Sequence, residues 1–174
     1  MTALAAASTF PKTNVEALDG STITLGAPRG DYDWQLVVVY RGLHCPICKT
    51  YLSKLQEAEA SFNEQGVDVV AVSGDPKEKA QKMADEKNLD ITIGYGLTPA
   101  QMKTLGVYIS DPRSAEETDR PFAEPAMFVV NGDGMIQIID VSNAPFARPE
   151  LDGIAGGIKF IRSNDYPIRG THSS

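Results

Sequence analysis

The chain has 174 residues, of which 42% are hydrophobic and 22% charged, and its formal net charge is −7. This size and composition are those of one globular domain with a substantial core, and the acidic balance argues against nucleic acid or an anionic membrane as the main partner. No apolar run reaches the length of a membrane-spanning helix, and residues 1–7 lack the basic start of a signal peptide, so we expect a cytoplasmic protein.

The chain alternates strand-like and helix-like segments between two ends without a clear pattern. We expect an N-terminal arm over residues 1–20, a folded domain over residues 21–163 and a C-terminal tail over residues 164–174. Apolar runs rich in β-branched residues predict strands at residues 22–25, 34–40, 67–73, 91–95, 126–130 and 135–141. Helical apolar spacing and capping signals predict helices at residues 45–65, 76–88, 98–106 and 149–162.

The order of these segments points to one fold class. The strand, helix and strand over residues 34–73 form a βαβ unit, whose two strands we expect to be parallel. The Asn-Gly-Asp-Gly turn at residues 131–134 joins the last two strands as an antiparallel hairpin. A long polar loop over residues 110–121 precedes that hairpin. This order predicts an α/β protein of thioredoxin-like fold, with a central mixed sheet flanked by helices on both faces.

Cys45 and Cys48 are the only cysteines of the chain, and both stand where the strand over residues 34–40 gives way to a helix. A thiol in the first turn of a helix faces unpaired backbone N–H groups and the positive end of the helix dipole. Both favour the thiolate, which is the nucleophilic form. The second cysteine lies on the same helix face, close enough to form a disulfide with the first. A Cys-x-x-Cys beside a βαβ unit therefore indicates redox chemistry.

Two other interpretations of the cysteines are open. They fit buried structural thiols, or half of a tetrahedral zinc site. The zinc interpretation lacks further ligands, because the only histidines are His44, directly beside Cys45, and His172, in the polar tail. We therefore expect a redox pair with neither a metal nor a cofactor.

The segment from Tyr40 to Leu52 reads Tyr-Arg-Gly-Leu-His-Cys-Pro-Ile-Cys-Lys-Thr-Tyr-Leu. It resembles the peroxiredoxin-like branch of the alkyl hydroperoxide reductase/thiol-specific antioxidant (AhpC/TSA, redoxin) family, and the resemblance extends over residues 20–162. It implies that Cys45 is the attacking cysteine and Cys48 the resolving one. It also implies that Pro125 opens the fourth core strand with a cis peptide bond that faces the cysteine pair. An ordinary strand-opening proline is the alternative at Pro125.

Three positions depart from the pattern of true peroxiredoxins. Val38 and Gly42 stand where those enzymes carry a proline and a hydroxyl residue ahead of the attacking cysteine, and Pro125 stands where they carry an arginine. Peroxide activation needs fixed hydrogen-bond donors around the O–O bond, so other groups must replace them. The candidate replacements are Arg41, Arg120 and Arg148.

Thiol–disulfide exchange is the mechanism that these residues favour. The Cys45 thiolate, with its pKa lowered by Arg41, His44 and the helix end, attacks a sulfur or a peroxide oxygen, and Cys48 resolves the adduct. His44 fits a solvated loop histidine equally well. The first hypothesis is therefore a thiol–disulfide oxidoreductase, the second a thiol-dependent peroxide reductase with the same pair, and the third a non-enzymatic redox-responsive binding protein that acts through residues 110–121.

Each enzymatic hypothesis requires a partner, because no further cysteine is available to reset the pair. We expect an external thiol donor, such as a thioredoxin-like or glutathione system, and a disulfide or peroxide substrate. Apolar and aromatic residues over residues 95–110 fit either a homodimer face, as in many relatives, or the core.

Overall fold

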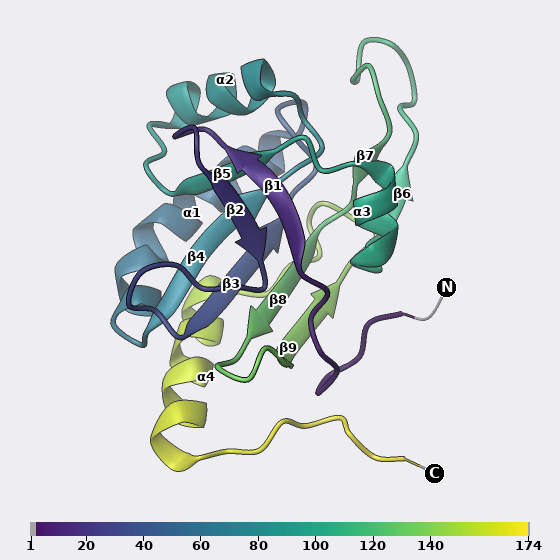
Figure 1. Ribbon diagram of the computed structural model, residues 1–174. Coiled ribbons are helices and arrows are strands. Elements are labelled where there is room, and N and C mark those ends of the chain that lie inside the picture. Colours follow the sequence, from purple (N-terminus) through teal and green to yellow (C-terminus); the bar gives the residue numbers. More distant parts are fainter. Residues whose placement is uncertain (1–2, 174) are drawn as a thin grey trace.

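The computed structural model describes residues 3–173 as a mixed β-sheet with helices on both faces (Figure 1). The seven strands of the sheet, in spatial order, are β2 Thr22–Leu25, β1 Thr13–Ala17, β5 Thr92–Tyr95, β4 Val67–Val72, β3 Trp34–Val39, β8 Ala126–Val130 and β9 Ile136–Val141. Two short strands pair separately: β6 Ile109–Ser110 and β7 Phe122–Ala123. The helices are α1 Pro46–Asn63, α2 Lys77–Lys87, α3 Pro99–Thr104 and α4 Leu151–Asn164. None of these described helices is long and apolar enough to cross a membrane.

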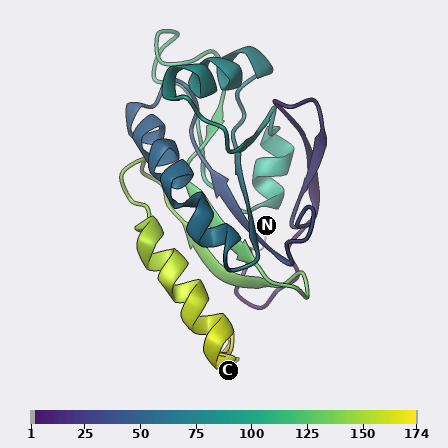
Figure 2. The same ribbon diagram turned by 90° about the vertical axis from the view of Figure 1, so that its left-hand side faces the viewer.

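The two faces of the sheet bury separate apolar clusters, because side chains alternate along each strand. Leu36 and Val38 of β3 pack toward α1, α2 and α4, whereas Val37 and Val39 join the cluster that contains α3 and the N-terminal strands. Figure 2 shows helices α1 and α4 on one side of the sheet and α3 on the other. The predicted α/β architecture with helices on both faces is confirmed.

Strand β3 is an interior strand of the sheet, between β4 and β8, and the turn that carries the cysteine pair follows it. It pairs in parallel with β4 and antiparallel with β8, so the predicted βαβ unit is present. Strands β8 and β9 form the predicted antiparallel hairpin. The carboxyl end of β3, which leads directly into the cysteine pair, is therefore held by a neighbouring strand on each side.

The N-terminal segment differs from the prediction, because β1 lies inside the expected arm. Its five residues, Thr13–Ala17, alternate strictly between buried and exposed. The strand pairs antiparallel with β2 across the turn at Asp19-Gly20, and with β5 on its other side. The alternation is the signal of a half-buried strand, and the sheet begins at Thr13 rather than after residue 20.

The region between β5 and β8 contributes to the core. Leu97, Met102, Leu105 and Val107 are buried in the apolar cluster on the α3 side of the sheet. Most apolar side chains of residues 95–110 therefore fit the core interpretation. The polar loop over residues 110–121 is closed at its base by the antiparallel pair of β6 and β7.

Candidate active site

Cys45 stands between the turn that follows strand β3 and helix α1. Its backbone is extended, with φ −110° and ψ 101°, and it forms the N-cap of α1, with Pro46 as the first helical residue. The Cys48 backbone N–H donates to the Cys45 Sγ at 3.3 Å. Both thiols are free and buried; Cys45 is 2% exposed and Cys48 is fully enclosed. The structure thus brings the predicted pair together with one sulfur over the open end of a helix.

The two thiols have opposite acidities. A hydrogen bond from the Cys48 thiol, together with the Cys48 N–H, Arg41 and the charge of Arg148, lowers the pKa of Cys45 to about 6, against the opposing effect of burial. Burial, and then the neighbouring Cys45 sulfur, raises the pKa of Cys48. Cys45 is therefore the thiolate near neutral pH, and Cys48 remains a thiol beside it.

Arg148 is the cation in direct contact with the pair. It precedes α4, and its Nη2 donates to the Cys48 Sγ at 2.7 Å. Its guanidinium carbon lies 4.8 Å from the centre of the Tyr51 ring, and the Tyr51 hydroxyl donates to the Pro149 carbonyl at 2.8 Å. Within residues 3–173, Nε and Nη1 of Arg148 are buried without a hydrogen-bond partner. In the sequence, Arg148 is only one of three candidate replacements for the missing donors, because no local pattern joins it to Cys48.

Arg41 lies on the other side of Cys45. Its Nε is 3.2 Å from Glu124 Oε2, an ion pair whose geometry makes no hydrogen bond, and its Nη2 is 3.9 Å from Glu117 Oε1. Its guanidinium carbon also lies 4.7 Å from the centre of the Phe122 ring. Two carboxylates and an aromatic ring therefore hold the guanidinium in place, and hydrogen bonding from Arg41 helps to lower the pKa of Cys45.

His44 is packed rather than solvated. Its ring meets Phe122 edge to face, with centroids 4.5 Å apart, and both ring nitrogens are buried with no partner among the described residues. Burial, followed by the charge of Arg41, lowers the pKa of His44. The imidazole is therefore neutral at neutral pH and adds no positive charge beside Cys45.

Pro125 lies between β7 and β8, and its peptide bond is trans, as is every other bond over residues 3–173. The cis bond implied by the family resemblance is not found. The trans form is the ordinary one even before a proline. The backbone on either side is hydrogen-bonded: the Glu124 N–H donates to the Tyr108 carbonyl at 2.8 Å, and the Ser142 N–H donates to the Pro125 carbonyl at 3.0 Å. Pro125, Tyr51 and Arg148 line the same small cavity. Of these three residues, Arg148 is the one that contacts a thiol, that of Cys48.

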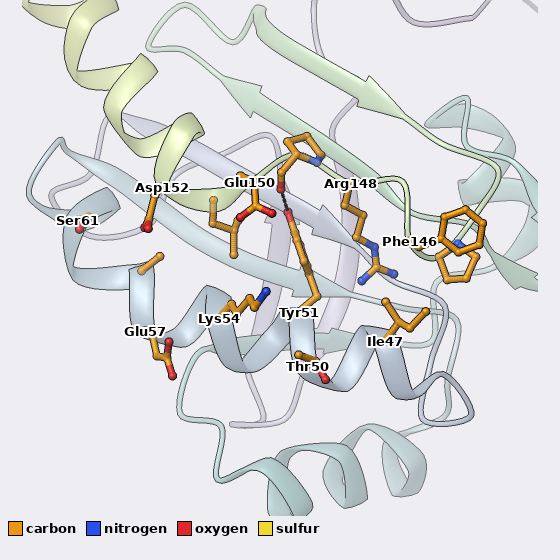
Figure 3. Close-up of a pocket in the computed structure, with 14 residues that line it drawn as sticks. Ile47, Thr50, Tyr51, Lys54, Glu57, Ser61, Phe146, Arg148, Glu150 and Asp152 are labelled. Atoms are coloured by element: carbon orange, nitrogen blue, oxygen red, sulfur yellow. Dashed lines mark hydrogen bonds between the residues drawn. The ribbon is translucent and has the colours of Figure 1, made fainter.

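A cleft of about 550 Å³ runs along α1, and Arg148, which donates to the Cys48 sulfur, is one of its lining residues (Figure 3). One wall is a single helix face that includes Ile47, Tyr51 and Lys54, and the other is the segment that leads into α4. Ile47 is 45% exposed and Phe146 is 76% exposed, and both lie at the Arg148 end of the cleft in Figure 3. Two exposed apolar side chains therefore lie at the end of the cleft where Arg148 contacts Cys48.

A second cleft, of about 630 Å³, lies against the turn on the other side of Cys45. Its lining residues are mostly charged or polar: Arg41, Leu43, His44, Pro46, Lys79, Arg113, Ser114, Glu116 and Glu117. The residues on both sides of Cys45 in the chain thus border open space, although Cys45 itself is buried.

The chain matches the family model described as the AhpC/TSA family over residues 6–139. It is 29% identical to alkyl hydroperoxide reductase C of Bacillus subtilis (strain 168) over 136 residues, which cover 75% of this chain and 69% of that protein.

Solved structures give the same picture of the fold. A peroxiredoxin-like protein from Aquifex aeolicus superposes with a TM-score of 0.75 at 20% identity, over 92% of this chain and 90% of that one. Peroxiredoxin 6 of Arenicola marina superposes with a TM-score of 0.74 at 18% identity, over 91% of this chain and 74% of that one. These likenesses support the thioredoxin-like fold, and the family match over most of the chain makes this protein a thiol-dependent oxidoreductase that belongs to the AhpC/TSA family.

Proposed function

We propose that the protein reduces a small hydroperoxide, with Cys45 as the nucleophile and Cys48 as the resolving thiol. The observation that carries this proposal is the opposite acidity of two adjacent thiols: the pKa of Cys45 is lowered to about 6, and burial raises that of Cys48. One sulfur is thereby ready to attack, and the other keeps its proton until an adduct has formed.

The proposed cycle has three steps. The Cys45 thiolate attacks the terminal peroxide oxygen; an S–O bond forms, the O–O bond breaks, and the leaving alkoxide takes a proton to become an alcohol. The Cys48 sulfur then attacks the sulfenic acid on Cys45; an S–S bond forms, and the hydroxyl leaves with the Cys48 proton as water. Two external thiols reduce this disulfide and are themselves oxidised, since the chain has no third cysteine.

Burial of the nucleophile favours a small oxidant over a protein disulfide. Cys45 is only 2% exposed, so a peroxide can approach its sulfur more readily than the disulfide of a folded partner can. Arg41 and Arg148 supply positive charge on both sides of the pair, where charge develops as the O–O bond breaks. These observations reverse the order of the first two hypotheses from the sequence, and membership of an enzyme family argues against the third.

Disulfide exchange remains the second candidate function because of two substitutions in the peroxiredoxin pattern. Gly42 offers no hydroxyl ahead of Cys45, and Pro125 stands where the family pattern has an arginine. A site without these donors orients a peroxide less strongly, whereas the Cys-x-x-Cys pair is sufficient for exchange with a disulfide.

The test is the second-order rate at which the pre-reduced protein loses its thiols to hydrogen peroxide, with Cys48→Ser as the matched variant. We expect a rate far above that of a free cysteine, and we expect Cys48→Ser to react once and stop at a sulfenic acid that a dimedone probe captures. A wild-type rate equal to that of free cysteine excludes the peroxidase and leaves exchange with a disulfide, which a parallel assay with a mixed-disulfide substrate measures.

A further inference from the structure

The peptide group between Gly42 and Leu43 is hydrogen-bonded on both sides. Its N–H, from Leu43, donates to Asp75 Oδ2 at 2.7 Å, and its carbonyl, from Gly42, accepts from the Cys45 N–H at 3.2 Å. One planar group therefore connects a carboxylate at the end of β4 with the backbone of the nucleophile at the end of β3. We propose that Asp75 is a positioning residue, whose carboxylate fixes this turn and thereby holds the Cys45 sulfur over the helix end.

The Asp75 side chain accepts a hydrogen bond from the turn before Cys45 and does not cap α2, the helix that follows it. A sequence of Asp-Pro ahead of a helix predicts an N-cap, yet the N-cap of α2 is Pro76 and no side chain caps that helix. The Asp75 backbone is fixed at both ends: its N–H donates to Ser73 Oγ at 3.2 Å, and its carbonyl accepts from the Gly96 N–H at 2.8 Å. The side chain, 3% exposed, has little freedom to turn elsewhere.

Gly42 makes the close approach of the carboxylate feasible. Its φ is +144°, a backbone conformation that favours glycine, and a Cβ at this position would lie 2.8 Å from Asp75 Oδ1. Gly42 is also the position where the family pattern has a hydroxyl residue. The Asp75 carboxylate thus occupies the space that such a side chain would need. A hydroxyl residue at position 42 and the buried carboxylate at its present place exclude each other.

The charge of the carboxylate strengthens the connection to Cys45. A charged acceptor polarises the amide that donates to it, and the carbonyl of the same amide becomes a better acceptor for the Cys45 N–H. Burial raises the pKa of Asp75, while the Leu43 N–H, Lys79 of α2 and Arg120 of the loop oppose that rise and Asp119 adds to it. The charged groups that act on the carboxyl are thus Lys79, Arg120 and Asp119.

The experiment measures the apparent pKa of Cys45 from the pH dependence of its alkylation by iodoacetamide, in the wild type and in Asp75→Ala. We expect Asp75→Ala to raise this pKa by about one unit, which is about a tenfold loss of thiolate in the acidic range. Asp75→Asn keeps an oxygen acceptor for the Leu43 N–H, so we expect a clearly smaller shift. The matched control is Asp68→Asn, because Asp68 is equally buried at the opposite end of β4 and binds Arg29 there.

The proposal rests on Cys45 as the nucleophile, but its assay does not depend on peroxide turnover. If hydrogen peroxide reacts slowly while Asp75→Ala still shifts the alkylation profile, the proposed function fails and the positioning role stands. A folded Asp75→Ala protein with an unchanged profile overturns the positioning role, as does an equal shift in Asp68→Asn. If Asp75→Ala does not fold, Gly42→Ala gives the same test, since its methyl group must displace the carboxylate, and an unchanged profile there also overturns the proposal.

Discussion

Arg148 and Cys48 are 100 residues apart in the chain, and Arg148 Nη2 donates to the Cys48 sulfur at 2.7 Å. The contact places a permanent positive charge on the thiol whose pKa burial raises. In the proposed cycle, the cation offsets part of the cost of ionising Cys48 when that sulfur attacks the oxidised Cys45. A buried resolving thiol needs such help, because only its thiolate is a good nucleophile.

Replacing the cation should slow this second step more than the first. We expect Arg148→Gln to reduce the rate of disulfide formation from the Cys45 sulfenic acid by about tenfold or more, the loss expected for one charge-assisted hydrogen bond. Stopped-flow oxidation by one equivalent of peroxide separates this slow step from the initial attack. Arg162→Gln is the matched control. Arg162 lies on α4, away from the thiols, and forms an ion pair with Asp33 at 2.7 Å. Equal slowing in the two variants would contradict a specific role for Arg148.

The reaction with oxidant should depend on the ionisation of Cys45. The pKa of this thiol is lowered to about 6, so we expect the rate with peroxide to rise from pH 5, reach half its plateau near pH 6 and level off above pH 7. An ordinary cysteine, with a pKa of about 8.5, continues to gain reactivity well above pH 8. The pH dependence of the second-order rate distinguishes these cases, and a midpoint near 8.5 would show that the helix end and its cations do not activate the sulfur.

Local patterns were sufficient for most of the fold and for the cysteine pair. The strand over residues 34–40, the turn after it and Cys45-Pro46 at the helix start are encoded within a dozen neighbouring positions, so their signals are strong. Strand β1 carries its own signal, the alternation of Thr13–Ala17, but this signal is only five residues long. Pairing with β2 and β5, which lie on either side of it, stabilises the strand.

The rest of the site depends on contacts between distant segments. Asp75 has the local signature of a helix cap, and only the folded chain brings it to Leu43, 32 positions earlier. The contact of Arg148 with Cys48 follows from how the segment before α4 packs on α1, which no periodicity encodes.

Tyr51 supports Arg148 in two separable ways, through its ring and through its hydroxyl. Tyr51→Phe removes the hydrogen bond to the Pro149 carbonyl and keeps the ring beneath the guanidinium. We expect it to lower the free energy of unfolding by about 1 kcal/mol and to leave the rate of disulfide formation nearly unchanged. Tyr51→Ala should also slow that step, because the guanidinium loses its aromatic support. Urea denaturation and the stopped-flow assay measure the two effects, and a Tyr51→Ala protein with wild-type resolution would contradict the role of the ring.

Arg41 has two functions that a double variant can separate. It favours the Cys45 thiolate, and it neutralises the buried carboxylate of Glu124, 3.2 Å away. Arg41→Gln should therefore raise the apparent pKa of Cys45 and, because it leaves a buried charge unpaired, lower the free energy of unfolding by about 3 kcal/mol. Adding Glu124→Gln removes the unpaired charge, so the double variant should regain most of the stability but keep the raised pKa. If stability and pKa recover together, Arg41 acts on Cys45 through the packing of the turn and not through its charge.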